Sequence, residues 1–308
     1  LRPKDGEETN HRLKMLMEPE LDAIQARGQQ SGSITGLETG FSSLDWMLSG
    51  MQPADFLLLA ARPSLGKTAL ATAIAANVTK KGKTTQFFSL EMSRSQVVQR
   101  MLTAEGRVDS HRVRTGQLEH EDWEKLVAGS NRLWDGECLI DDNSLITPAY
   151  MRSVCRRTKA KHGLDLVIVD YLQLMNGGAG DGKPGENRNA ELSDISRSLK
   201  LLGKEFGVPV FALSQLSRNV EKRENKRPML SDLRDSGSLE QDADVVMFLY
   251  RESYQADGGT AADPEAAMKP DETEVIIRKQ RMGPTGTVKL GFVPAYARFE
   301  ELADEEEI

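Results

Sequence analysis

Residues 61–68, Ala-Arg-Pro-Ser-Leu-Gly-Lys-Thr, have the residue types and spacing of a loop that binds nucleotide phosphates. Gly66 lets the backbone approach the phosphates, Lys67 can reach the β- and γ-phosphates, and the Thr68 hydroxyl can bind Mg²⁺. The pattern G-x-x-x-x-G-K-[ST] is broken only at Ala61, which stands in place of its first glycine. The alternative for these residues is an ordinary strand-to-helix turn with an exposed lysine. The predicted nucleotide-binding residues are Ala61, Arg62, Pro63, Ser64, Leu65, Gly66, Lys67, Thr68 and Ala69.

Three polar side chains, those of Glu91, Asp170 and Gln215, come at the ends of later apolar runs. Ligands of doubly wound sheets bind at the carboxyl ends of the strands, so we expect these side chains beside the phosphate loop. Asp170 with Thr68 is predicted to hold Mg²⁺, directly or through water, and Gln215 to sense a phosphate. An acid at a strand end is often only a helix cap, and Glu91 taken alone leaves that alternative open.

Basic residues gather in two later segments. Lys279 and Arg281 precede a Gly-Pro-Thr-Gly turn, and such a pair is usually a solvated hairpin tip. The segment from Arg218 to Arg234 contains six basic residues against three acidic ones, which is typical of a solvated surface loop. Several copies of this segment around one channel would nevertheless attract a nucleic-acid backbone, even in an acidic protein.

Strand and helix signals alternate along the chain that carries these residues. Strands that are apolar throughout and interleaved with helices indicate an α/β fold, with a largely parallel central sheet covered by helices on both faces. The segments 274–279 and 287–292 predict a late antiparallel β-hairpin. Strands are predicted at 56–61, 86–90, 137–141, 164–170, 208–214 and 243–250, and helices at 68–81, 93–106, 119–133, 147–162 and 189–206.

The composition fits a protein of the cytoplasm. The 308 residues carry a net charge of −7, contain 39% hydrophobic residues, and include no run that resembles a signal peptide or a membrane span. Cys138 and Cys155 lack the spacing of a disulfide framework or a zinc site and are predicted to be buried or partly buried thiols. Because the chain begins with Leu1 rather than Met, we expect a fragment or a processed product.

The order of these motifs closely resembles the replicative DnaB-type hexameric helicases. The resemblance covers residues 34–299, a RecA-like motor domain, with a linker helix before it, and the family accepts Ala at the first phosphate-loop position. By this resemblance the chain would be a motor fragment that lacks the family's N-terminal helical domain. The resemblance rests on Ala-Arg-Pro-Ser-Leu-Gly-Lys-Thr, Phe-Ser-Leu-Glu-Met-Ser, Val-Ile-Val-Asp-Tyr-Leu-Gln-Leu-Met, Ser-Gln-Leu-Ser-Arg, Leu-Arg-Asp-Ser-Gly-Ser-Leu-Glu-Gln-Asp-Ala-Asp and Lys-Gln-Arg-Met-Gly-Pro-Thr-Gly.

The resemblance implies a role for each candidate residue. Glu91 would polarise the attacking water, and Gln215 would couple the γ-phosphate to the DNA side. Lys279 and Arg281 would be inserted by a neighbouring subunit beside the γ-phosphate. Single-stranded DNA would be gripped by loops that contain Arg218, Lys222, Arg223, Arg234, Asp235 and Gly237.

We therefore expect a DNA helicase motor that depends on ATP and Mg²⁺ and moves 5′–3′. It would act as a homohexamer on single-stranded DNA at a fork. A helicase loader and primase would be its partners, and no membrane contact is expected. A RecA-type recombinase and a nucleotide-gated DNA-binding or assembly module are the alternatives. The expected divisions are a disordered segment 1–10, a linker helix and linker 11–33, the motor domain 34–299 and an acidic disordered tail 300–308.

Overall fold

The computed structural model describes residues 12–29, 34–175, 188–217, 220, 223, 226–253 and 264–302, with the backbone alone for residues 23, 26–29, 234–237, 264 and 265. A single nine-stranded sheet crosses these residues in the order β3-β2-β4-β5-β1-β6-β7-β8-β9. The strands from β3 to β6 are parallel, and those from β7 onward are antiparallel. Their bounds are β1 Phe56–Ala61, β2 Thr85–Ser89, β3 Cys138–Asp141, β4 Leu166–Asp170, β5 Val210–Gln215, β6 Val245–Tyr250, β7 Asp271–Gln280, β8 Gly286–Val293 and β9 Arg298–Glu301.

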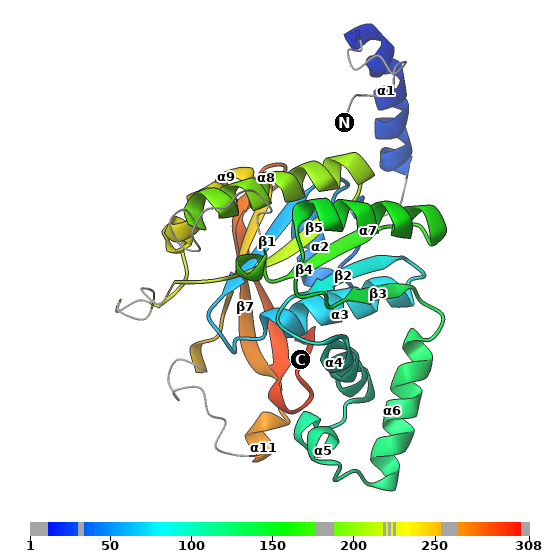
Figure 1. Cartoon of the computed structure of the whole chain (residues 1–308), viewed down its shortest axis with the longest axis vertical. Helices are drawn as coiled ribbons and strands as arrows, with labels where there is room; N and C mark the ends of the chain where they lie inside the picture. The colour runs from blue at the N-terminus through cyan, green and yellow to red at the C-terminus, as the bar shows by residue number, and fades with distance from the viewer. Residues whose placement is uncertain are drawn as a thin grey trace.

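The parallel strands are apolar throughout because helices cover both faces of the sheet, as the sequence predicts. Along β1, Leu57 and Leu59 pack with α2, α3 and α4, whereas Phe56 and Leu58 pack with α7, α8 and α9. Figure 1 shows α7, α8 and α9 on one side of the sheet and α3 and α4 on the other. The helices are α1 Leu13–Gln29, α2 Ser42–Leu48, α3 Lys67–Lys80, α4 Arg94–Gly106, α5 Ser110–Thr115, α6 His120–Leu133, α7 Pro148–Lys161, α8 Arg188–Phe206, α9 Gly237–Asp242 and α11 Pro264–Ala267, with 3₁₀ helices η1 Leu172–Leu174, η3 Leu230–Ser236 and η4 Pro294–Tyr296.

The predicted late hairpin is confirmed as β7 and β8, which pair antiparallel with Val275 opposite Val288. The boundary of the predicted acidic tail is wrong, because Glu300 and Glu301 belong to β9. Glu300 forms an ion pair with Arg107 at 3.2 Å, and Glu301 accepts a hydrogen bond from the Ser43 amide at 3.1 Å. The charge of Glu300 is thus balanced by Arg107, and the Glu301 carboxylate is hydrogen-bonded by Ser43, whereas the composition alone marks both acids as solvated. Residues 303–308 lie outside the described residues, as do the predicted disordered residues 1–10.

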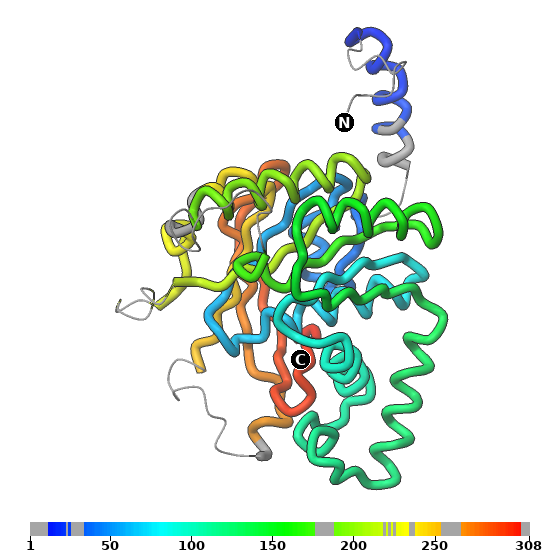
Figure 2. Tube along the Cα trace, viewed as in Figure 1, coloured from blue at the N-terminus to red at the C-terminus, as the bar shows by residue number. Residues whose placement is uncertain are grey.

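The segment predicted as a linker helix contains the helix α1, which continues through Pro19. Its role as a linker stays a prediction. Its apolar side chains are exposed, with Leu13 at 73% and Leu21 at 61%. In the tube view the helix stands away from the sheet (Figure 2). None of the helices in the described part of the chain is both long and apolar enough to cross a membrane.

Both thiols match their prediction. Cys155 is buried and Cys138 is half-buried, and neither forms a disulfide within the described chain. Burial raises the pKa of each thiol to about 12, so both stay protonated at neutral pH.

Candidate active site

The carboxyl ends of neighbouring parallel strands bring the predicted site residues to one edge of the sheet. Ala61 at the end of β1 lies beside Gln215 at the end of β5. Ser89, which ends β2 just before Glu91, lies beside Asp170 at the end of β4. Segments far apart in the sequence therefore meet around the phosphate loop, as the parallel arrangement predicts.

The loop itself has the geometry that close approach to phosphates needs. Gly66 has a φ of 98° and stands directly before Lys67, the first residue of α3. A side chain at Gly66 would meet Phe299 Cε2 at 3.2 Å, and that backbone conformation strains any residue other than glycine. The amides of the first turn of α3 are oriented for an anion at the helix N-terminus.

Thr68 and Asp170 form a pair suited to a hard cation. The Thr68 hydroxyl donates a hydrogen bond of 2.7 Å to Asp170 Oδ2. Asp170 is fully buried, and its Oδ1 is without a hydrogen-bond partner among the described residues. Burial raises the pKa of this carboxyl, against the Thr68 hydrogen bond and the charge of Lys67.

These two residues fit Mg²⁺, which binds proteins through one or two oxygen ligands and completes its shell with water and substrate phosphates. The described part of the chain contains no group of three His, Cys, Asp or Glu side chains able to hold a metal alone. A site made by Thr68, Asp170 and the nucleotide agrees with that finding.

Lys67 is buried at the start of α3, with its Nζ 4.8 Å from the centre of the Tyr171 ring. Burial lowers the pKa of its ammonium, and the charges of Asp170 and Glu91 oppose that shift. A phosphate bound beside this ammonium would stabilise its charged form, which burial destabilises.

Glu91 is exposed at this edge and interacts electrostatically with Lys67, Asp170 and Arg100. Arg100 is a site residue that the sequence analysis missed. Burial lowers the pKa of its guanidinium, and the carboxylates of Asp170 and Glu91 oppose the shift. The sequence did offer one indication of this position. Arg100 comes three residues after Val97, which is buried on α4, and residues three apart lie on the same side of a helix.

Gln215 is exposed at the end of β5, and its main chain is held by Gln173, a second residue that the sequence analysis missed. Gln173 accepts a hydrogen bond from the Gln215 amide at 3.2 Å and donates one to the Gln215 carbonyl at 3.1 Å. Arg62 donates a hydrogen bond of 3.1 Å to the Leu216 carbonyl, which ties the phosphate loop to the same strand end. These contacts leave the Gln215 side chain at the exposed edge.

Lys279 and Arg281 lie at the opposite edge of the sheet. β7 runs antiparallel to β6 and places Gln280 beside Val245, at the amino end of β6. A strand of six residues such as β1 is ~20 Å long, so neither side chain reaches the phosphate loop of its own chain. Both are held there by α9: Lys279 donates to the Glu240 carbonyl at 2.5 Å and Arg281 to the Gln241 carbonyl at 2.9 Å.

The candidate DNA-binding residues fall between β5 and β6. Arg218 and Lys222 lie outside the described residues. Arg223 forms an ion pair with Asp232 at 2.6 Å, so its charge is engaged within the chain. The backbone of Arg234 and Asp235 belongs to η3, and α9 begins at Gly237.

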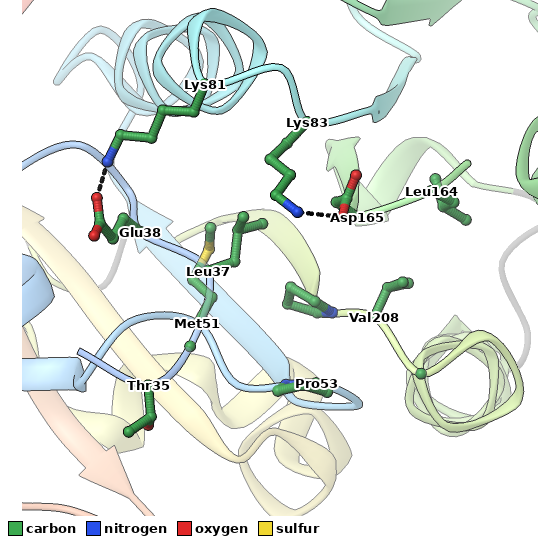
Figure 3. Close-up of a pocket in the computed structure, with 13 residues that line it drawn as sticks. Thr35, Leu37, Glu38, Met51, Pro53, Lys81, Lys83, Leu164, Asp165 and Val208 are labelled. Carbon is green, nitrogen blue, oxygen red and sulfur yellow. Dashed lines mark hydrogen bonds and ion pairs between the residues drawn. The ribbon is translucent and has the colours of Figure 1, made fainter. Parts of the chain in front are cut away.

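A separate hollow at the amino edge of the sheet is not part of this site (Figure 3). It is lined by Met51, Pro53 and Val208 among others, and its two lysines already have carboxylate partners. Lys81 pairs with Glu38 and Lys83 with Asp165. With both charges neutralised, the hollow lacks the cations that a phosphate would need.

Comparison with known proteins agrees with this geometry. A sequence model described as "DnaB-like helicase C terminal domain" matches residues 36–301. The chain belongs to this family. Among curated DnaB-like proteins, "Replicative DNA helicase DnaB" of Geobacillus stearothermophilus is 48% identical over 291 residues, which are 94% of this chain and 62% of that protein. "Replicative DNA helicase DnaC" of Bacillus subtilis (strain 168) is 47% identical over the same shares. The chain thus spans about 62% of the length of these DnaB-like relatives.

Solved DnaB-like structures share the fold. The structure titled "ATPase Domain of G40P" has a TM-score of 0.85 at 37% identity, covering 96% of this chain and 100% of that one. A second, titled "The Structure Of A DnaB-Like Replicative Helicase And Its Interactions With Primase", has a TM-score of 0.81 at 37% identity and covers 97% of this chain and 68% of the other. The predicted RecA-like fold of the DnaB-like family is confirmed.

Proposed function

We propose that this chain is the motor domain of a replicative DNA helicase, which hydrolyses ATP at the interfaces of a homohexamer to move along single-stranded DNA and separate the duplex. The observation that carries the proposal is the division of the catalytic groups between two edges of one sheet. Lys67, Thr68 and Asp170 lie at the carboxyl edge, whereas Lys279 and Arg281 lie at the amino edge. A complete site therefore needs a second copy of the chain.

In the proposed mechanism, the loop amides and Lys67 bind the phosphates, and Glu91 orients and polarises the attacking water. Mg²⁺ held by Thr68 and Asp170 would neutralise charge on the phosphate oxygens. Arg281 of a neighbouring copy, with Lys279 beside it, stabilises the charge of the transition state, which is worth a factor of ~10³–10⁵ for such an arginine. Gln215 links the γ-phosphate to the segment after β5.

DNA contact is proposed for the segments between β5 and β6, with Arg218, Lys222, Arg234, Asp235 and Gly237 facing a central channel. Arg223 would contribute less, because Asp232 already neutralises it. The similarity to DnaB helicases supports 5′–3′ movement, a loader and primase as partners, and a site of action at the replication fork. One structural relative bears a title that names its interactions with primase.

Replacement of Glu91 by Gln tests the mechanism. We expect ATP to bind with nearly unchanged affinity while turnover falls by at least ~10²-fold, because the amide cannot accept the proton of the attacking water. Equilibrium binding and steady-state hydrolysis measure the two effects. Glu121→Gln, on the exposed surface of α6, is the matched control and should behave like the parent chain.

Continued hydrolysis by Glu91→Gln would exclude Glu91 as the base. A comparison of forked-duplex unwinding with strand exchange separates the helicase from a RecA-type recombinase, since strand exchange without unwinding favours the recombinase. ATP-dependent DNA binding without any hydrolysis by the parent chain would favour a nucleotide-gated assembly module.

A further inference from the structure

Arg251 lies directly behind the phosphate loop and is absent from the set of predicted site residues. It follows β6, the strand beside β1, and its side chain is only 5% exposed. One guanidinium nitrogen, Nη2, donates a hydrogen bond of 3.3 Å to the carbonyl of Leu65. That carbonyl belongs to the peptide unit that joins Leu65 to Gly66.

The orientation of this peptide unit decides where the Gly66 amide points. In a trans peptide the C=O and N–H bonds point in opposite directions. Because the Leu65 carbonyl faces Arg251, the Gly66 N–H faces away from Arg251. A positive charge at the carbonyl end also polarises the peptide, which makes the N–H a stronger donor.

The side chains of Phe292 and Asp271 help to hold Arg251 in this position. Its guanidinium lies 4.4 Å from the centre of the Phe292 ring, within the range of a cation–π contact. Nη1 lies 3.6 Å from Asp271 Oδ2, which also accepts a hydrogen bond of 2.6 Å from Ser253. Phe292 packs on Phe299 with ring centres 4.9 Å apart, and Phe299 closes the space beside Gly66.

We propose that Arg251 is a positioning residue of the nucleotide site, which fixes the Leu65–Gly66 peptide so that its amide is preset to bind phosphate. The proposal rests on the proposed nucleotide-binding function. The residue acts through the loop backbone rather than through the base or the sugar. Its removal therefore weakens every ligand that has a phosphate chain, whether or not a nucleoside is attached.

The test is calorimetric binding of two probes, ADP and inorganic tripolyphosphate, each with Mg²⁺, to the 308-residue chain. For Arg251→Met we expect both affinities to fall about tenfold or more, because a hydrogen bond from a charged group is lost. Arg251→Lys, which keeps the charge without the planar fork, should lose less for both probes. Arg157→Met, an exposed arginine on α7, is the control and should bind both probes like the parent chain.

Thermal unfolding of each variant shows whether it is folded. If Arg251→Met does not fold, Arg251→Lys and Asp271→Asn are tested instead. For these two variants we expect a smaller loss of affinity for both probes. Unchanged tripolyphosphate affinity in the folded variants overturns the proposal, and so does a loss confined to ADP, which would place Arg251 at the nucleoside. Failure of the parent chain to bind either probe would instead count against the proposed function.

Discussion

At the scale of single residues, the site depends on polar atoms that the fold leaves ready for a ligand. The Asp170 carboxylate uses one oxygen for Thr68 and keeps the other buried, so binding a cation satisfies an atom that burial would otherwise penalise. Lys67 is in the same situation, since its burial lowers the pKa of its ammonium until an anion arrives. In the proposed site, the metal ion would therefore offset the cost of burying the Asp170 carboxylate, and the nucleotide phosphates would offset the cost of burying the Lys67 ammonium.

Asp170→Asn should separate these two effects. The amide oxygen can still accept the Thr68 hydrogen bond, so the fold is kept while the charge toward Mg²⁺ is lost. We expect the Mg²⁺ concentration needed for half-maximal ATP hydrolysis to rise about ten- to a hundredfold, by analogy with other losses around metal sites. A Mg²⁺ titration of hydrolysis measures it, with Asp194→Asn on the exposed side of α8 as control. An unchanged Mg²⁺ requirement would remove Asp170 from the metal site.

The residues of this site were predictable to different degrees. Lys67, Thr68 and Asp170 are recognisable because a motif and an apolar strand fix their places in the chain. Arg100, Gln173 and Arg251 were missed because each acts through a tertiary contact that no local pattern records. Arg251, for example, follows an ordinary buried strand, and its role depends on a carbonyl 186 residues earlier in the chain.

At the scale of elements, a cluster of charges closes the amino edge of the sheet. Asp244 accepts a hydrogen bond from the Phe56 amide, pairs with Lys200 and lies 3.3 Å from Arg281. Burial and the charge of Asp244 together raise the pKa of the nearby Asp55 to about 6, against the charges of Lys200 and Arg281. The strand starts are thus joined to the segment that carries Arg281.

The raised pKa of Asp55 predicts how stability varies with pH. Its carboxyl ionises near pH 3.8 in the unfolded chain and near pH 6 in the folded one, so the folded state holds more protons between these values. The free energy of unfolding should therefore fall as pH rises from about 4 to 6, and the loss should persist above pH 6. Asp55→Asn should reduce this dependence and stabilise the chain at pH 8 more than at pH 4.

Urea unfolding at the two pH values measures the effect, and Asp194→Asn again serves as the control. An equal change in stability at both pH values would show that Asp55 does not carry the shift.

Elements with a clear apolar pattern were predicted closely, and elements without one were not. β1 coincides with its predicted range of 56–61 because all six of its residues are apolar. α4 lies within one residue of its predicted range of 93–106 because its 13 residues are enough to show a helical period. α2, α5 and β9 were not anticipated. Each is only four to seven residues long, too short for a clear period, and β9 exists because β8 offers it a pairing edge.

At the scale of the whole molecule, the proposed site is shared between copies in a head-to-tail arrangement. Such heterologous contacts close into rings when the rotation between copies permits it. In this proposal each copy would give Glu91 to one interface and Arg281 to the next. A defect in either residue is therefore confined to one side of the subunit.

Mixing two inactive variants tests this arrangement. Glu91→Gln and Arg281→Ala should each hydrolyse ATP poorly, by a factor of ~10³ or more for the arginine. A one-to-one mixture should recover activity, because about a quarter of randomly formed interfaces combine an intact Glu91 with an intact Arg281. Steady-state hydrolysis after mixing measures it, and Glu91→Gln mixed with Lys67→Ala, whose defects lie on the same side, is the control. No recovery would contradict the proposed contribution of Arg281 to the site of a neighbouring copy.

β7 has one further consequence for such a ring. Asp271, at its start, contacts Arg251 behind the chain's own phosphate loop, and the strand ends at Gln280, between Lys279 and Arg281. Its ten residues span ~33 Å and are hydrogen-bonded to β6 on one side and to β8 on the other. In the proposed ring, β7 would therefore connect two successive nucleotide sites through one continuous strand. A shift at one phosphate loop would then reach the next site through a tilt of the whole subunit rather than through the bending of a loop.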